Sequence, residues 1–160
     1  TENSGPKAAQ KESFSGRAAV ICDKEDSAKD ALALVEKVAE NLEMNTIYMR
    51  SDAHDIHTAY VSHISHITSY ALANTVLEKE REEDTIFQLA SSGFSSTVRL
   101  AKSHPEMWVP IFKQNKENVL DVLNEHITQL RKFKSALEKE NFELLEELIK
   151  NANKIRGILK

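Results

Sequence analysis

HDIHTAYVSHISH, residues 54–66, begins the longest helical segment that the sequence predicts, residues 54–78. Apolar side chains such as Ile56 and Val61 recur at helical spacing among polar ones, and the period-two pattern of a strand does not occur after Arg50. Four further segments show helical patterning: 82–90, 96–102, 115–137 and 141–156. The pattern therefore predicts a mainly α fold for the larger part of the chain.

The first fifty residues differ from this helical part. AAVICD, residues 18–23, and NTIYM, residues 45–49, are short apolar runs that predict strands, and residues 31–42 between them have helical spacing. Strand, helix, strand is typical of an α/β unit, yet two strands are too few for a stable sheet domain. We expect residues 1–52 to be the last part of a larger α/β domain and residues 53–160 to form an all-helical domain.

Composition and charge argue against several classes of protein. The chain is 41% hydrophobic and 29% charged, with a net charge of −4, so no basic face predicts nucleic-acid binding. Cys22 is the single cysteine, which excludes an intrachain disulfide and fits a cytoplasmic protein. No apolar run approaches the length of a membrane span. TENSGP, residues 1–6, lacks an initiator methionine, and we expect this end to be cut.

The histidines of residues 54–66 do not share one helix face. At about 100° per residue and with Asp55 at zero, His66 falls near about +20°, His63 near about +80° and Ser62 near about −20°. His54 and His57 fall on the far side, so four histidines cannot meet on one metal, although His63 and His66 could supply two ligands. No third ligand is evident, and we predict no metal site.

Asp55, Ser62 and His66, with His63 beside them, form a polar stripe along this helix. Two interpretations remain open at this point. The stripe is either a solvated face or satisfied buried network, or it is a binding site in which histidine and hydroxyl groups contact a ligand carboxylate or hydroxyl.

A second polar element lies at SSGFSSTVRLAKSHPEMW, residues 91–108. Gly93 predicts a turn, Ser95 to Thr97 are helix-capping candidates, and Arg99 would follow in the first turn. Free backbone N–H groups, the helix dipole and an Arg together favour an anion, although Arg99 could equally form a surface ion pair. Trp108, the single tryptophan, is an expected aromatic anchor of the core.

These residues together resemble the prephenate dehydrogenase family. The resemblance lies in the order and spacing of His54-Asp55, SHISH at 62–66, Gly93 to Arg99, AKSHPEMW at 101–108 and IFKQNKENV at 111–119. TENSGP at 1–6 resembles the end of a family signature whose catalytic His would precede Thr1. The resemblance covers roughly residues 1–120.

The resemblance implies an enzyme of tyrosine biosynthesis that converts prephenate to 4-hydroxyphenylpyruvate with NAD or NADP. It implies a Rossmann nucleotide-binding domain, of which residues 1–52 would be the end, and a helical domain that forms a homodimer. His66 and Arg99 would bind prephenate, and Ser62 and His63 would line the same wall. The resemblance further implies that Gly93 and Trp108 shape the pocket and that Asp55 and Glu2 belong to a polar network.

Three departures and three alternatives accompany the resemblance. The Gly-rich dinucleotide fingerprint is absent, Ser65 stands where the family commonly has Pro, and Ser92 where it frequently has a second Gly. We therefore expect this stretch to be inactive alone. The alternatives are an arogenate dehydrogenase, a non-catalytic helical dimerisation or ligand-sensing module, and a metal-dependent hydrolase. Feedback inhibition by tyrosine is also compatible with the family.

Overall fold

The computed structural model describes Pro6, residues 9–83 and residues 85–159. The chain divides into two compact units, Thr1–Val119 and Leu120–Lys160. This division does not test the domain boundary expected between residues 52 and 53, which stays a prediction.

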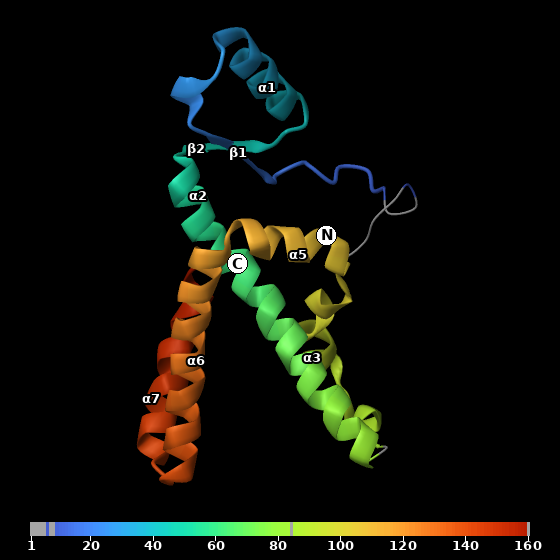
Figure 1. Ribbon diagram of the computed structural model, residues 1–160, viewed down its shortest axis with the longest axis vertical. Coiled ribbons are helices and arrows are strands. Elements are labelled where there is room, and N and C mark those ends of the chain that lie inside the picture. The colour runs from blue at the N-terminus through green and yellow to red at the C-terminus, as the bar shows by residue number, and fades with distance from the viewer. Residues whose placement is uncertain (1–5, 7–8, 84, 160) are drawn as a thin grey trace. The chain divides into compact units, whose positions relative to one another are not determined.

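The first unit begins with a strand–helix–strand element. Strands β1 (Ala18–Cys22) and β2 (Asn45–Met49) pair in parallel, with Ala18 opposite Asn45 and Cys22 opposite Met49. Helix α1 (Lys29–Asn41) connects them and lies along one side of the pair (Figure 1). This confirms the predicted strand–helix–strand order. Apolar side chains of α1 remain open to solvent, with Leu34 exposed by 64%.

A long helical run follows the second strand. It consists of α2 (Ser51–Thr58), a π-helical segment η3 (Ala59–His63) and α3 (Ile64–Glu83), continuous in Figure 1. The Asp23 carboxylate accepts a hydrogen bond of 3.1 Å from the Ser51 N–H and so occupies one of the free donors at the start of α2.

Short elements connect α3 to the next long helix. They are the 3₁₀ turn η4 (Ile86–Leu89), helix α4 (Ser92–Thr97) and the 3₁₀ turn η5 (Arg99–Lys102), and α5 (Pro105–Gln114) follows. Helix α5 begins at Pro105, a residue that suits the first turn because proline has no N–H to leave unsatisfied there.

Two helix predictions in this region are wrong. Residues 82–90 were expected to form one helix, but α3 ends at Glu83 and only the short η4 turn follows. Ser95, Ser96 and Thr97 lie inside or at the end of α4 and do not cap it; its N-cap position is Ser91, without a side-chain cap hydrogen bond. Three adjacent hydroxyl residues look like a cap in sequence, yet the helix begins one turn earlier.

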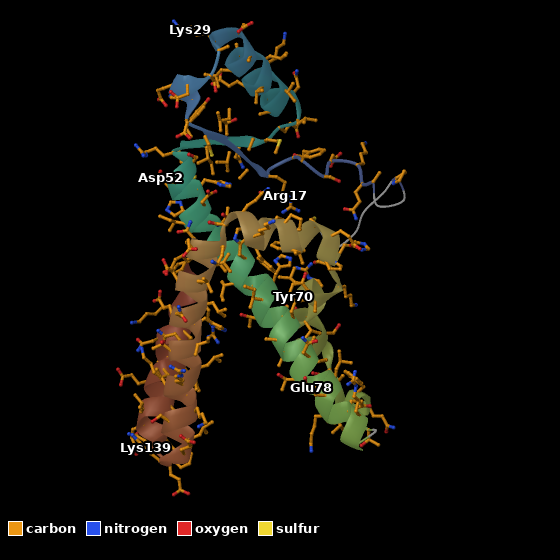
Figure 2. All side chains as sticks on the ribbon, viewed as in Figure 1. Arg17, Lys29, Asp52, Tyr70, Glu78 and Lys139 are labelled. Atoms are coloured by element: carbon orange, nitrogen blue, oxygen red, sulfur yellow. The ribbon has the colours of Figure 1, made fainter. Side chains whose placement is uncertain are left out.

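The second unit is a helical hairpin. It contains most of α6 (Lys116–Glu138), all of α7 (Phe142–Asn153) and the 3₁₀ turn η6 (Lys154–Gly157). The Asn141 side chain caps α7 by accepting the Leu144 N–H at 2.9 Å. Figure 2 marks Lys139 in the turn between the two helices. Both predicted C-terminal helices are therefore confirmed, with ends shifted by one to three residues.

The second unit buries few residues and exposes many apolar ones. Val122 and Ala136 are buried, at 4% and 1% exposure. Seven large apolar side chains between residues 130 and 159 are about half exposed or more: Leu130, Leu137, Phe142, Ile149, Ile155, Ile158 and Leu159. Within the ranges that the structure describes, no helix combines the length and apolar character needed to cross a membrane.

Candidate functional site

The π-helical segment η3 sets the direction of the histidines. The Ile64 N–H donates to the Ala59 carbonyl five residues earlier, which is the hydrogen bond of a π turn. A π turn is wider than an α turn, so the chain rotates less per residue across it. His63 consequently lies on the same side as Asp55, whereas a uniform helix would place them about 80° apart. The even rotation assumed in the sequence analysis is wrong here for this reason.

Asp55 and His63 line one pocket at the junction of α2 and α5. The pocket has a volume of about 330 Å³, and its wall consists of His54, Asp55, Thr58, His63, Ile111, Gln114 and Asn115. His54 Nδ1 lies 3.1 Å from an Asp55 carboxylate oxygen, so these adjacent polar groups interact at the rim.

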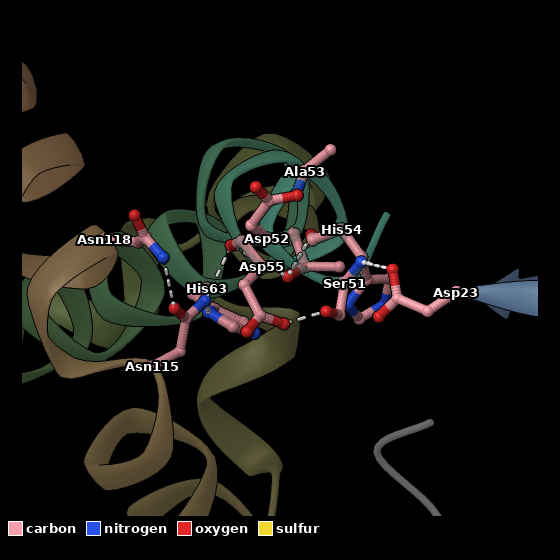
Figure 3. Close-up of polar contacts among 10 residues, drawn as sticks. Asp23, Ser51, Asp52, Ala53, His54, Asp55, His63, Asn115 and Asn118 are labelled. Atoms are coloured by element: carbon pink, nitrogen blue, oxygen red, sulfur yellow. Dashed lines mark hydrogen bonds and ion pairs between the residues drawn. The ribbon is translucent and has the colours of Figure 1, made fainter. Parts of the chain in front are cut away.

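His63 is tied to Asn115, at the junction of α5 and α6, by a chain of hydrogen bonds (Figure 3). The Asn115 Nδ2 group donates to the Asp55 carbonyl at 2.7 Å and lies 3.3 Å from His63 Nδ1. Asn118 Nδ2 donates to Asn115 Oδ1 at 2.7 Å. The two short bonds fix which end of the Asn115 amide is nitrogen, so this nitrogen is the group that faces His63.

His66 makes a different contact through the same ring atom. Its Nδ1 lies 3.1 Å from the Ser62 carbonyl oxygen, which can only accept, so His66 Nδ1 carries the hydrogen. The ring stacks on Trp108, with centroids 3.4 Å apart and planes inclined by 28°. Tyr70 is a second aromatic neighbour of His66, with ring centroids 6.3 Å apart.

Trp108 and Phe112 on α5 complete an aromatic cluster around both histidines. The edge-to-face distances from His63 are 6.0 Å to Trp108 and 6.2 Å to Phe112, and Trp108 and Phe112 are 5.5 Å apart. Trp108 is 7% exposed. It is therefore an aromatic core anchor, as expected, and also the common contact of the two histidines.

Burial keeps both histidines neutral. His63 is 8% exposed and His66 9% exposed. Burial lowers the pKa of His63, with a smaller contribution from the neighbouring His66, while Asp55 acts in the opposite direction. Burial also lowers the pKa of His66, and the charge of Arg99 lowers it further, against the hydrogen bond to Ser62. At pH 7 the two rings act as neutral hydrogen-bonding groups.

Arg99 lies near His66 and is the first residue of the short η5 turn. It follows α4, which ends at Thr97, and so does not stand in the first turn of a helix capped by Ser95 to Thr97; its role as an anion contact stays a prediction. The Ser69 hydroxyl, 2% exposed, donates to the Thr97 carbonyl at 2.6 Å. This buried bond attaches the segment before Arg99 to α3.

A second pocket lies on the other side of the aromatic cluster. Its volume is about 390 Å³, and its wall consists of Tyr70, Ala101, Ser103, Pro105, Trp108, Val109 and Phe112. Three buried polar atoms of this wall, Tyr70 Oη, Ser103 Oγ and Trp108 Nε1, have no hydrogen-bond partner among the described residues. Unpaired buried donors are costly, so these three atoms are polar groups of this wall with unused hydrogen-bonding capacity.

The remaining expected site residues are less connected. Ser62 enters the site through its carbonyl. Gly93 lies in α4 and lines neither pocket; a Cβ there would meet only Ser91 Oγ at 3.7 Å, so packing does not require glycine. Glu2 lies outside the described residues. Among those described, no three or more His, Cys, Asp or Glu side chains are arranged to hold a metal ion.

Sequence reasoning missed Asn115 and Ser69. Asn115 is 9% exposed and lies within IFKQNKENV, a stretch already noted as family-like. It could have been recognised as an uncharged amide that follows the otherwise apolar face of the preceding helix. Ser69 lies one turn after His66 and carried no separate signal.

The family is decided by a comparison with known proteins. Residues 50–151 match the sequence model of the prephenate dehydrogenase dimerization domain. The chain belongs to this family. All the described contacts of His63, His66 and Asn115 lie within the matched residues.

Relatives extend the likeness to the whole chain. A cyclohexadienyl dehydrogenase of Zymomonas mobilis is 29% identical over 100% of this chain and 55% of its own length. A prephenate dehydrogenase of Bacillus subtilis is 26% identical over 98% of this chain and 42% of its own length. The chain thus spans about half the length of the curated relatives it matches.

A solved structure has the same fold. The prephenate dehydrogenase of Aquifex aeolicus, in complex with hydroxyphenyl propionate and NAD+, superposes with a TM-score of 0.88 at 30% identity, over 100% of this chain and 56% of that one. An arogenate dehydrogenase of Synechocystis, 22% identical, shares the fold with a TM-score of 0.75. The predicted fold class is confirmed: mainly α, after a short α/β remnant of a Rossmann domain.

Proposed function

We propose that this chain supplies the substrate-binding and dimerising part of an NAD(P)-dependent prephenate dehydrogenase. The observation that carries the proposal is the buried pair His63 and His66, gathered around Trp108 with the charge of Arg99 close to His66. The pair lies within the residues that match the family. Names of the relatives support the activity, and a cytoplasmic location fits it.

The substrate explains why these residue types are needed. Prephenate carries two carboxylates and a 4-hydroxyl group on a cyclohexadienyl ring. Its oxidation releases one carboxylate as carbon dioxide, and the ring becomes aromatic. NAD or NADP would accept the hydride from C4. Because this sequence has no Gly-rich dinucleotide fingerprint, the proposal assigns no cofactor-binding residue to the chain.

Each site residue has a proposed task. Arg99 pairs with a substrate carboxylate, since guanidinium binds carboxylate with two parallel hydrogen bonds. His66 adds a second contact to the substrate, and His63 and Ser62 line the same wall. Trp108 holds both rings in place and excludes water. Asp55 acts through its carbonyl, which accepts the Asn115 amide.

Two further parts of the proposal concern partners. We propose a homodimer through the helical domain, supported by the family description and by the apolar side chains that the second unit leaves exposed. Tyrosine, which shares the hydroxyphenyl ring of the product, is a proposed inhibitor. The roles of Gly93 and Glu2 stay predictions from the resemblance.

The test is an assay of the full-length protein with prephenate and NAD or NADP, followed by the absorbance of the reduced nicotinamide. Prephenate-dependent reduction with release of 4-hydroxyphenylpyruvate supports the proposal. Reduction with arogenate alone would reassign the substrate. No reduction with either substrate would refute a catalytic role and leave a dimerisation or ligand-sensing module.

Arg99→Ala tests the carboxylate contact in that assay. We expect kcat/KM for prephenate to fall by about tenfold to a hundredfold, because a charge-assisted hydrogen bond contributes about 1.5–3 kcal/mol. The KM for the nucleotide should change little. Lys102→Ala, an exposed cation in the same η5 turn, is the matched control. Equal losses of kcat/KM in the two variants would mean that Arg99 contributes only to the positive charge of this turn and does not contact the substrate carboxylate.

A further inference from the structure

The two buried histidines differ in what their Nδ1 atoms contact. His66 Nδ1 faces the Ser62 carbonyl, an acceptor, at 3.1 Å. His63 Nδ1 faces the Asn115 amide nitrogen, a donor, at 3.3 Å. A neutral imidazole carries one hydrogen, so the partner of one nitrogen decides the state of the other. His66 is therefore the Nδ1–H tautomer, and His63 is the Nε2–H tautomer.

We propose that Asn115 is a positioning residue that fixes His63 as a neutral Nε2–H donor, so that the site presents His63 as a donor and His66 as an acceptor. This inference rests on the proposed function for its catalytic consequence. The tautomers themselves follow from the hydrogen bonds alone. A site of this kind suits a substrate with an oxygen that accepts from His63.

The Asn115 amide is not free to rotate to accommodate a charged His63. Rotation by 180° would place its oxygen against the Asp55 carbonyl and its nitrogen against the Asn118 amide nitrogen. It would break hydrogen bonds of 2.7 Å on both sides. Protonation of His63 at Nδ1 would instead bring two N–H groups together. Either change leaves buried donors or acceptors unpaired, so Asn115 resists protonation of His63.

His66 has no such restraint. If it gains a proton at Nε2, its Nδ1–H bond to Ser62 stays intact. A substrate carboxylate at Nε2 would therefore be able to draw a proton onto His66 but not onto His63. The charged and titratable groups that act on His63 are Asp55, His54 and His66, while its aromatic contacts on α5 are uncharged.

The direct test is long-range ¹H–¹⁵N NMR of ¹⁵N-histidine in the full-length protein, which distinguishes a protonated from an unprotonated ring nitrogen. We expect His63 to show Nε2–H and His66 to show Nδ1–H at pH 7.5. In Asn115→Asp, the new carboxylate accepts from His63 Nδ1, so His63 should become Nδ1–H or doubly protonated. Gln114→Glu adds a carboxylate to the wall of the same pocket but keeps the Asn115 amide at His63 Nδ1, and should leave both tautomers unchanged.

The kinetic test uses the same variants with prephenate. Asn115→Asp should lower kcat/KM for prephenate by about tenfold to a hundredfold, with a new ionisation in its pH profile and little change in nucleotide KM. Asn115→Leu, which removes the amide without adding charge, should show a mixture of His63 tautomers and no new ionisation. His63 as Nδ1–H in the unsubstituted protein would overturn the proposal. If no dehydrogenase activity exists, the NMR result still decides the tautomers.

Discussion

The stability of this protein should fall as the pH drops below about 6.5, because of His63 and His66. Burial lowers the pKa of both side chains in the folded protein, whereas the unfolded chain has the ordinary value near 6.5. Between the folded and unfolded pKa values the unfolded state binds more protons. Stability is then full above the unfolded value and is lost as the pH falls towards the folded values.

The steepest possible dependence of the free energy of unfolding on pH follows from the number of protons that the two histidines bind on unfolding. One histidine contributes at most about 1.4 kcal/mol per pH unit to the free energy of unfolding, and two contribute about 2.7 kcal/mol. Small domains are stable by only about 5–15 kcal/mol, so a slope approaching this limit would be measurable against the total. Asp23 and Asp52 have pKa values lowered by hydrogen bonds from Ser51 and Arg50, respectively, and act in a separate range below 3.8.

Denaturant unfolding between pH 7.5 and 5 measures this slope. Trp108 is the single tryptophan and stacks on His66, so its fluorescence reports the site directly, since protonated imidazole quenches indole emission. His63→Gln and His66→Gln should each reduce the slope, and His57→Gln, an exposed histidine on α2, should not. A slope that is flat, or that survives both buried substitutions, would refute the argument from burial.

Two further predictions concern packing and helix register. Trp108→Ala should lower the free energy of unfolding by about 3–5 kcal/mol by emptying the aromatic cluster, while Val109→Ala, at a position 63% exposed, should cost under about 0.5 kcal/mol; thermal and denaturant unfolding compare them. Deleting Val61, 75% exposed in the π segment, should convert it to regular α-helix with a small change in Tm, whereas deleting exposed Thr75 from regular α3 should lower Tm clearly. Similar Tm losses would count against the π turn.

Local patterns predicted most of the secondary structure. The parallel strands β1 and β2 and the helices α6 and α7 follow from apolar spacing, and Pro105 marks the start of α5. The prediction of a helix over residues 82–90 was wrong because continued helical spacing does not show where a helix stops. Such a stop depends on tertiary contacts, here the packing of the η4 turn against α3.

The candidate site was harder to predict because its contacts are long-range. The stripe of Asp55, Ser62 and His66 was evident in sequence, and Trp108 was expected as an anchor. The stacking of His66 on Trp108 joins residues 42 positions apart. Asn115 and His63 are separated by 52 positions. The helical periodicity of one segment does not contain such information. Only the resemblance to a family brought His63, His66 and Trp108 together, and it assigned no role to Asn115.

The direction of His63 shows a further limit of periodicity. A helical wheel assumes an equal rotation for every residue, and one wide turn at Ala59–His63 rotates all later residues relative to Asp55. His63 and His66 are both histidines and are buried to nearly the same extent, yet their rings have opposite hydrogen-bonding roles. Those roles depend on one backbone carbonyl and one amide. Sequence can therefore nominate the histidines of this site, but their chemical tasks are set by the neighbours of Nδ1.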